Sequence, residues 1–440
     1  MPTDNQQSHI KQLINEAPLS GYQVLVVLIC FVLNFNDGID VLLVSFTAPS
    51  IAHSLGLSQT QLGYIFSAGL AGMTAGCFLL APLADRIGRR PVFIISLFTI
   101  TTGMLLVYFS DGFGELLLLR CLTGFGIGGI LPNLATIAAE FSNQKTRDFN
   151  VGIVQGGWPL GAILTGFVTS KILPAYGWKF TYLVSGSFSL LMLLVVVAFL
   201  PESPMFLLER RPKKALSKLN AILQKIGQPI LSALPIPVQN IKKVSVAQLF
   251  TKSLRTTTLL LWLGIFLGFL TLYTVLSWVP NLAKESGMPM VLSIYLGTTL
   301  NLGAFTGVFV MGLSIGKFGI KRVMAVFMTL AFTFMMVFGT TNLFYMWKFA
   351  LIFLIGFFVQ GGFNTFYPAS SRIYPESIRA TGIGWAMGIG RFGAIIGPTL
   401  FGMFHDMGFS IALRFAIFSV PLLLAAVLVY KIPSRNMEKA

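Results

Sequence analysis

Charged side chains are scarce in this sequence. Asp, Glu, Lys and Arg together make up 10% of the 440 residues, whereas an average soluble domain has about 25%. Hydrophobic residues account for 55% of the chain. This balance excludes an ordinary water-soluble domain and indicates a protein that spans a membrane.

Cysteine and histidine are also rare, with three residues of each. Cys30, Cys77 and Cys121 have no paired spacing, so neither a disulfide framework nor a metal site is predicted, and packing is the expected role of all three. No nucleophile with a base and an orienting group, and no phosphate-binding loop, is found in the sequence. We therefore expect no enzyme, no metal and no cofactor.

Acidic residues are outnumbered, since 15 Asp and Glu stand against 31 Lys and Arg, for a net charge of +16. Nucleic acid would attract such a charge, but most of the basic residues fall on one side of the topology described next. Positive charge collects on the cytoplasmic side of membrane proteins. We therefore expect both termini in the cytoplasm and no nucleic-acid partner. The first twenty residues lack the features of a cleaved signal peptide.

Apolar segments long enough to cross a bilayer, which takes about 20 residues, recur along the whole chain. They predict an all-α membrane protein with twelve transmembrane helices in two pseudo-symmetric six-helix halves. The expected units are a cytoplasmic N-terminal segment 1–20, a bundle 21–200, a cytoplasmic linker 201–255, a bundle 256–431 and a cytoplasmic tail 432–440. The expected helices are 21–48, 61–83, 92–110, 115–139, 149–171, 178–200, 256–280, 290–315, 323–343, 347–368, 380–404 and 410–430.

The two halves match when the chain is shifted by about 232 residues, as in transporters built from repeats. Four charged residues have no charged counterpart in the other half: Asp37, Asp40, Arg120 and Arg391. A scaffold residue would be expected in both halves, so these four are the functional candidates. The matched positions include Gly124 with Gly356, Gly129 with Gly361 and Gly161 with Gly393.

Two of these charges stand in the stretch NFNDGIDVLL of the first expected helix. A charged group at bilayer depth costs about 3 kcal/mol and usually faces a polar cavity. A spacing of three residues places Asp37 and Asp40 on roughly one helix face, and Arg120 is expected at a similar depth. These three residues are predicted to couple protons, with Arg120 as the electrostatic partner and Asp40 slightly favoured as the principal proton site.

Arg391 lies roughly 16 Å inside the eleventh expected helix at the helical rise per residue. A guanidinium group offers a planar pair of donors to a carboxylate, so Arg391 is predicted to bind an anionic substrate. Packing and bonding between helices remain open alternatives for the other candidate pocket residues. These are Gln360, Asn364, Tyr367, Trp158 and Tyr273.

The loop APLADRIGRRPV, residues 81–92, resembles the signature loop of the major facilitator superfamily, with Ala81 where a glycine is usual. Gly316 replaces the aspartate in the second copy of the loop, MGLSIGKFGIKRV. The resemblance implies a cytoplasmic latch that breaks as the halves rock, although Arg89 and Arg90 equally fit a role in topology alone. The predicted gating residues are Asp85, Arg86, Gly88, Arg89, Arg90, Glu140, Arg147 and Arg379.

Four further stretches narrow the resemblance: NDGID, RCLTGFGIGG, LPESP and IRATGIGWAMGIGRFGAIIGP. Together they resemble the aromatic acid:proton symporters of the same superfamily. The resemblance implies import of benzoate-type carboxylates with protons across the bacterial inner membrane by alternating access. The protein is expected to be a monomer. A symporter for muconate, a sugar acid or another organic anion remains an alternative, as does a membrane sensor without transport.

Overall fold

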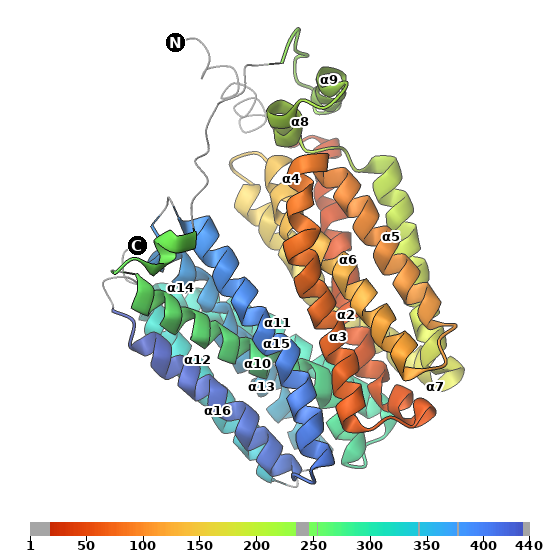
Figure 1. Cartoon of the computed structure of the whole chain (residues 1–440), viewed down its shortest axis with the longest axis vertical. Coiled ribbons are helices and arrows are strands. Elements are labelled where there is room, and N and C mark those ends of the chain that lie inside the picture. The colour runs from red at the N-terminus through yellow and green to blue at the C-terminus, as the bar shows by residue number, and fades with distance from the viewer. Residues whose placement is uncertain (1–17, 235–245, 253, 342–343, 376–377, 434–440) are drawn as a thin grey trace.

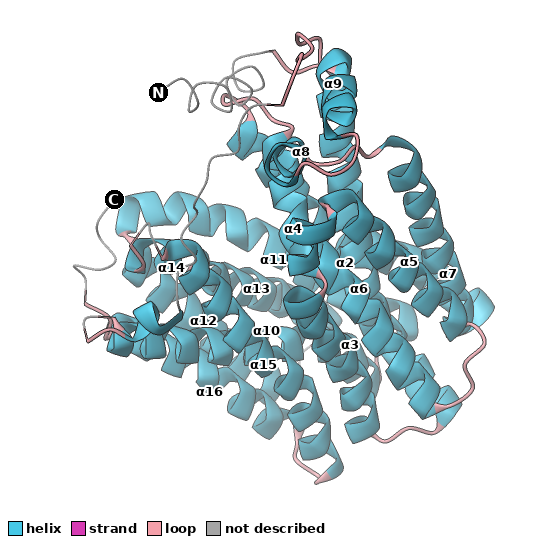
Figure 2. Cartoon of the chain, turned by 45° about the horizontal axis from the view of Figure 1, so that its top comes forward, coloured by secondary structure: helices cyan, strands magenta, loops and turns pink. Residues whose placement is uncertain are grey.

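The computed structural model describes residues 18–234, 246–252, 254–341, 344–375 and 378–433. Within these ranges the chain is helical and contains no strand (Figure 1, Figure 2). The predicted all-α class is confirmed. Most of the expected N-terminal segment 1–20 and of the expected tail 432–440 lies outside the described residues.

The first bundle begins with two helices that cap themselves. The hydroxyl of Ser20 accepts from the backbone N–H of Gln23, and that of Ser58 accepts from Gln61, which are capping boxes. The elements of this bundle are α2 (Gly21–Leu55), α3 (Gln59–Leu79), η1 (Ala81–Leu83), α4 (Ala84–Ile87), α5 (Arg89–Val107), α6 (Phe113–Glu140) and α7 (Arg147–Phe199).

Eleven helices are long and apolar enough to cross a membrane in the described part of the chain, whereas the sequence predicts twelve spans. The difference lies in α7, which has 53 residues and would be about 80 Å long, far more than the roughly 30 Å of a bilayer core. Inside α7, Gly177 takes the non-helical angles φ 79° and ψ 173°. The chain turns there, so α7 provides two spans and the total is twelve.

A linker separates the two bundles and carries α8 (Pro204–Arg210), α9 (Ala215–Lys225) and η2 (Val246–Phe250). Both α8 and α9 lie at one end of the first bundle (Figure 1). The second bundle contains α10 (Arg255–Glu285), α11 (Met290–Phe318), α12 (Ile320–Thr340), α13 (Tyr345–Asn364), α14 (Phe366–Ile373), α15 (Arg379–Asp406) and α16 (Ile411–Tyr430).

Glycines at matched positions bring helices together in the same way in both halves. A Cβ on Gly124 would collide with the carbonyl oxygen of Gly69, and a Cβ on Gly356 would collide with that of Leu300. Gly69 and Leu300 are themselves related by the repeat. Small residues allow such close approach of helix backbones in membranes, so the repeat seen in the sequence is also a repeat of packing.

The two bundles meet at the end where α2 finishes and α3 begins, which we call the short-loop side. The end that carries α8 and α9 is the linker side. The hydroxyl of Ser45 on α2 donates to the carbonyl oxygens of Leu276 and Ser277 on α10, 2.8 Å from each. Toward the linker side the ribbons of the two bundles diverge (Figure 1).

Substitution of Gly124 by Val is expected to destabilise the first bundle, because the new side chain meets the backbone of α3. Overpacking of this kind costs about 1–3 kcal/mol. Gly152→Val is the matched control, since nothing lies within 4 Å of a Cβ built there. Thermal unfolding of the purified variants in detergent measures the difference, and equal melting temperatures would contradict the packing role.

Candidate functional site

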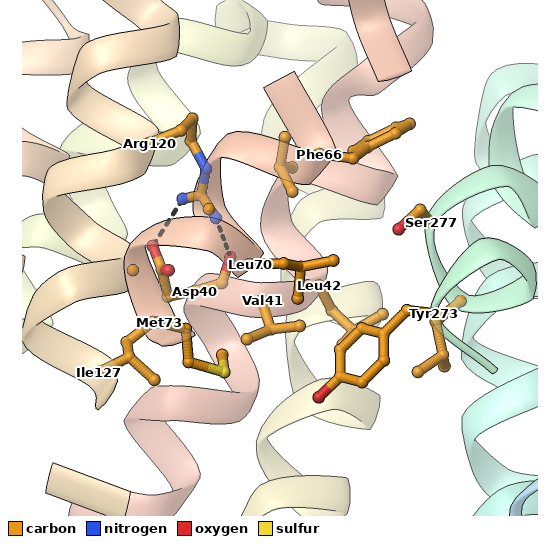
Figure 3. A pocket seen from close by; sticks show the side chains of 14 residues that line it. Asp40, Val41, Leu42, Phe66, Leu70, Met73, Arg120, Ile127, Tyr273 and Ser277 are labelled. Carbon is orange, nitrogen blue, oxygen red and sulfur yellow. Dashed lines mark hydrogen bonds and ion pairs between the residues drawn. The ribbon is translucent and has the colours of Figure 1, made fainter. Parts of the chain in front are cut away.

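A buried ion pair joins α2 to α6 in the first bundle. Arg120 donates from Nη1 to Oδ1 of Asp40 at 2.8 Å and from Nη2 to the carbonyl oxygen of Asp40 at 3.4 Å (Figure 3). The side chains of Arg120 and Asp40 are only 4% and 0% exposed. The structure therefore brings together the two residues that the sequence predicts as partners.

This pair lies beside the boundary between the two halves. Asp40 and Arg120 line a small cavity that Tyr273 and Ser277 of α10 close from the second bundle (Figure 3). Asp40 Oδ2 and Arg120 Nε are buried without a hydrogen-bond partner among the described residues. The geometry of the ion pair is thus fixed, but each partner keeps one buried polar atom without a hydrogen bond in the described part of the chain.

Asp37 lies almost one turn before Asp40 on α2 and is 5% exposed. No ion pair within 4.0 Å is found for it in the described part of the chain, and its Oδ1 atom is buried without a hydrogen bond. Its charged neighbours in electrostatic range are Asp40 and Arg391. Gly38, the next residue, lets α2 contact the backbone of Trp158 on α7.

Arg391 on α15 differs from Arg120 in being half-buried and in having no carboxylate within 4.0 Å among the described residues. Its Nη1 donates to the sulfur of Met73 on α3 at 2.8 Å, and a thioether is a weak acceptor. Asp37, Tyr273 and Tyr367 lie within its electrostatic range. Most of its donor fork is therefore available to a ligand between the two halves.

The remaining pocket candidates fall into two groups. Tyr273 and Tyr367 lie near Arg391, and Tyr367 is 45% exposed. On α13, the amide of Asn364 donates to the backbone carbonyl of Gln360 at 2.9 Å, which is an ordinary contact within a helix. Gln360 Oε1 is buried without a partner in the described residues, and the half-buried Trp158 contacts α2 through its backbone.

Two residues near Arg391 were not recognised from the sequence as part of this region. Met73 is its hydrogen-bond acceptor, and Cys77, one turn later on α3, lies in electrostatic range of both Arg391 and Asp37. The sequence predicts only packing for the cysteine. Their spacing of four residues places both sulfurs on one face of α3, but no feature of the sequence marks which face meets α15.

On the linker side, a second cluster holds the first bundle together. Arg89 pairs with Glu140 and donates to Ser203 at 2.8 Å. Glu202 Oε1 accepts from the backbone N–H groups of Arg89 at 2.8 Å and Arg90 at 3.3 Å, which satisfies the start of α5. Gly88 has φ 105°, and a Cβ there would collide with Glu202.

The other predicted gating residues lie on the linker side of the two halves. Asp85 is exposed and forms no ion pair within 4.0 Å in the described chain, while its carbonyl oxygen accepts from Arg210 Nε at 2.9 Å. Arg86 is exposed as well. Arg147 begins α7, and Arg379 begins α15 and donates to the carbonyl oxygen of Tyr374 at 3.4 Å.

Two helical halves around buried charges near the middle of the membrane define a secondary transporter. The family model described as Major Facilitator Superfamily matches residues 27–398 and 295–440. This chain therefore belongs to the major facilitator superfamily. It is a multi-pass membrane protein and not an enzyme, as the sequence predicts.

The chain is 32% identical over 425 residues to the 4-hydroxybenzoate transporter PcaK of Acinetobacter baylyi, covering 95% of this chain and 93% of that protein. It is 31% identical over 420 residues to a gallate transporter of Pseudomonas putida, with the same coverage of 95% and 93%. These relatives confirm the resemblance to the aromatic acid branch.

Solved structures agree on the fold. The inward-open xylose transporter XylE from E. coli matches with a TM-score of 0.73 at 18% identity, over 93% of this chain and 96% of that one. A D-xylose-proton symporter gives the same TM-score at 17% identity, over 96% of this chain and all of that one. At such low identity the match concerns the fold alone, and it confirms the predicted architecture.

Loss of Arg120 is expected to be costly because it leaves Asp40 buried without its cation. Breaking a buried pair from one side costs about 3–5 kcal/mol, so Arg120→Gln should unfold at a clearly lower temperature than the wild type. The double variant with Asp40→Asn removes both charges and should recover part of the loss. Thermal unfolding of both variants is the measurement. A double variant less stable than Arg120→Gln alone would contradict the ion-pair explanation.

Proposed function

We propose that this protein imports aromatic carboxylates of the hydroxybenzoate class together with protons. The relatives named 4-hydroxybenzoate and gallate transporters support the substrate class. The observation that carries the proposal is the state of Arg391, a half-buried cation at the boundary between the halves with no carboxylate partner within 4.0 Å among the described residues. An incoming carboxylate supplies that partner.

In this proposal the substrate lies between α3, α10, α13, α14 and α15. Arg391 takes the carboxylate through two parallel hydrogen bonds, and the rings of Tyr273 and Tyr367 flank the aromatic ring. The free oxygen of Gln360 accepts from a ring hydroxyl. Trp158 and Asn364 have a smaller part, because Trp158 packs its backbone against α2 and Asn364 bonds within its own helix.

Proton coupling follows from the position of Asp37 near the same arginine. An ionised Asp37 attracts Arg391 and competes with the substrate, whereas a protonated Asp37 leaves the guanidinium to the anion. Proton and substrate then favour each other's binding. The sequence slightly favoured Asp40 as the proton site, but its bond to Arg120 makes Asp37 our first choice, with Asp40 and Arg120 as a fixed partner pair.

Transport then proceeds by rocking of the two halves, which exposes the site to each side in turn. We place the linker side and both termini in the cytoplasm of a bacterial cell, as the basic residues of the linker favour, with the protein acting as a monomer in the inner membrane. With the short-loop side closed, the structure corresponds to the inward-facing state. The cluster of Arg89, Glu140 and Glu202 is the inner latch in this scheme.

Uptake by purified protein in liposomes tests the proposal. An inward proton gradient is expected to drive accumulation of labelled 4-hydroxybenzoate, and unlabelled aromatic acids should compete better than muconate or a sugar acid. Asp37→Asn should abolish accumulation against a gradient while exchange of substrate persists. The reverse order of competition would favour the aliphatic anions, and binding without any flux would favour a sensor.

Arg391→Lys is expected to weaken 4-hydroxybenzoate binding by one to two orders of magnitude even though the charge is kept, because an ammonium group cannot form the planar fork. Equilibrium binding to the purified variant measures this. Arg322→Lys, an exposed residue on α12, which supplies no residue to the proposed site, is the matched control and should bind as the wild type does. Unchanged affinity in Arg391→Lys would remove Arg391 from the binding site.

A further inference from the structure

At the short-loop side, a carboxylate from one half binds the start of a helix from the other half. Asp406, the last residue of α15, accepts from the backbone N–H of Thr60 at 2.8 Å and from that of Gln59 at 3.3 Å. These are the first two residues of α3. The N-terminus of a helix carries unpaired donors and a partial positive charge, so Asp406 caps α3 across the boundary.

The location of Asp406 is unfavourable for its own helix. A carboxylate in the last turn lies near the negative end of the α15 dipole, where cations are preferred. Ser58 already caps the third residue of α3, through a bond of 3.2 Å from the N–H of Gln61. Asp406 therefore accepts hydrogen bonds from the two backbone N–H groups that the side chain of Ser58 leaves unpaired, those of Gln59 and Thr60. Both groups belong to the other half.

Side chains of the second bundle hold Asp406 in place. His405 approaches Oδ1 of Asp406 at 3.3 Å and Oε1 of Glu285 at 3.1 Å. Glu285 in turn accepts from Nη2 of Arg414 at 2.9 Å. Arg414 is 1% exposed, so it anchors this chain of contacts inside the second bundle.

A second contact crosses the boundary beside the first. The amide of Asn281 on α10 donates to the side-chain oxygen of Gln59 at 2.8 Å. Asn281, Gln59 and Glu285 also line a cavity of about 670 Å³ on the short-loop side. Both contacts must break if the halves separate here, and the donors that they release would face the solution.

We propose that Asp406 is an outer gating residue, whose carboxylate keeps the transporter closed on the short-loop side by capping α3 from the opposite half. The inference rests on alternating access from the proposed function, but not on the identity of the anion or on proton coupling. Opening toward the outside exchanges the Asp406 bonds for water, so the strength of this cap contributes to the free-energy difference between the closed and outward-facing states.

Distances between spin labels on the short-loop side test the proposal. Gly114, where a Cβ meets nothing within 4 Å, and Met346, which is 79% exposed, provide one label site in each half. The labels are attached in a cysteine-free background that unfolds at the same temperature as the wild type. Asp406→Asn is expected to raise the population of the long, outward-open distance on the order of tenfold, because charge-assisted bonds weaken.

Asp111→Asn is the matched control. Asp111 is also an aspartate on the short-loop side, but its partner is Lys179, 2.5 Å away in the same half, so the distance distribution should not change. Asn281→Ala removes the second contact and should give a smaller shift than Asp406→Asn. If neither Asp406→Asn nor Asn281→Ala lengthens the distance, the gating role is wrong. A longer label distance in Asp406→Asn without any uptake of aromatic acids by the wild type would support the gating role of Asp406 and count against the proposed substrate.

Discussion

A charge inside a bilayer is stable only when another group compensates for the water it has lost, and this constraint organises the centre of the protein. Asp40 and Arg120 compensate each other within the first half, at 2.8 Å. Asp37 and Arg391 belong to different halves and interact without an ion pair within 4.0 Å among the described residues. One pair is therefore fixed, and in the proposed function a proton and an anion complete the other.

Close packing of α2 against α7 fixes the directions in which Asp37 and Asp40 point, and so makes the difference between the two charge pairs possible. Gly38 meets the backbone of Trp158, and Gly157 and Gly161 meet the backbone of α2 at Phe31 and Phe35. With this face of α2 committed to backbone contact, the carboxylates of the stretch NDGID are held in a defined direction. The glycine between the two aspartates thus has a packing reason, which is independent of the chemistry of its neighbours.

Much of the fold could be predicted from the sequence because it follows from apolar length and from the repeat. The twelfth span is recovered once Gly177 is seen to turn α7 back. The charged residues without a counterpart in the other half also predicted the pairing of Asp40 with Arg120, because the depth of each residue along its helix could be estimated from the sequence. The contact of Arg391 with Met73, 318 residues apart, and that of Asp406 with α3 could not be predicted, because both depend on which helix faces meet between the halves.

The contacts differ in kind at the two ends of the molecule. On the linker side, Arg89, Glu140 and Ser203 bind each other within the first half and its following segment, so they stiffen one body. On the short-loop side, Asp406 binds the opposite half. Between these ends, Ser45 contacts the carbonyl oxygens of α10 at the point where the repeat-related helices cross. In the proposed mechanism, rigid halves that pack through α2 with α10, α3 with α15 and α7 with α11 move as whole bodies once the cap opens. The central charges then change their exposure without a change in the fold of either half.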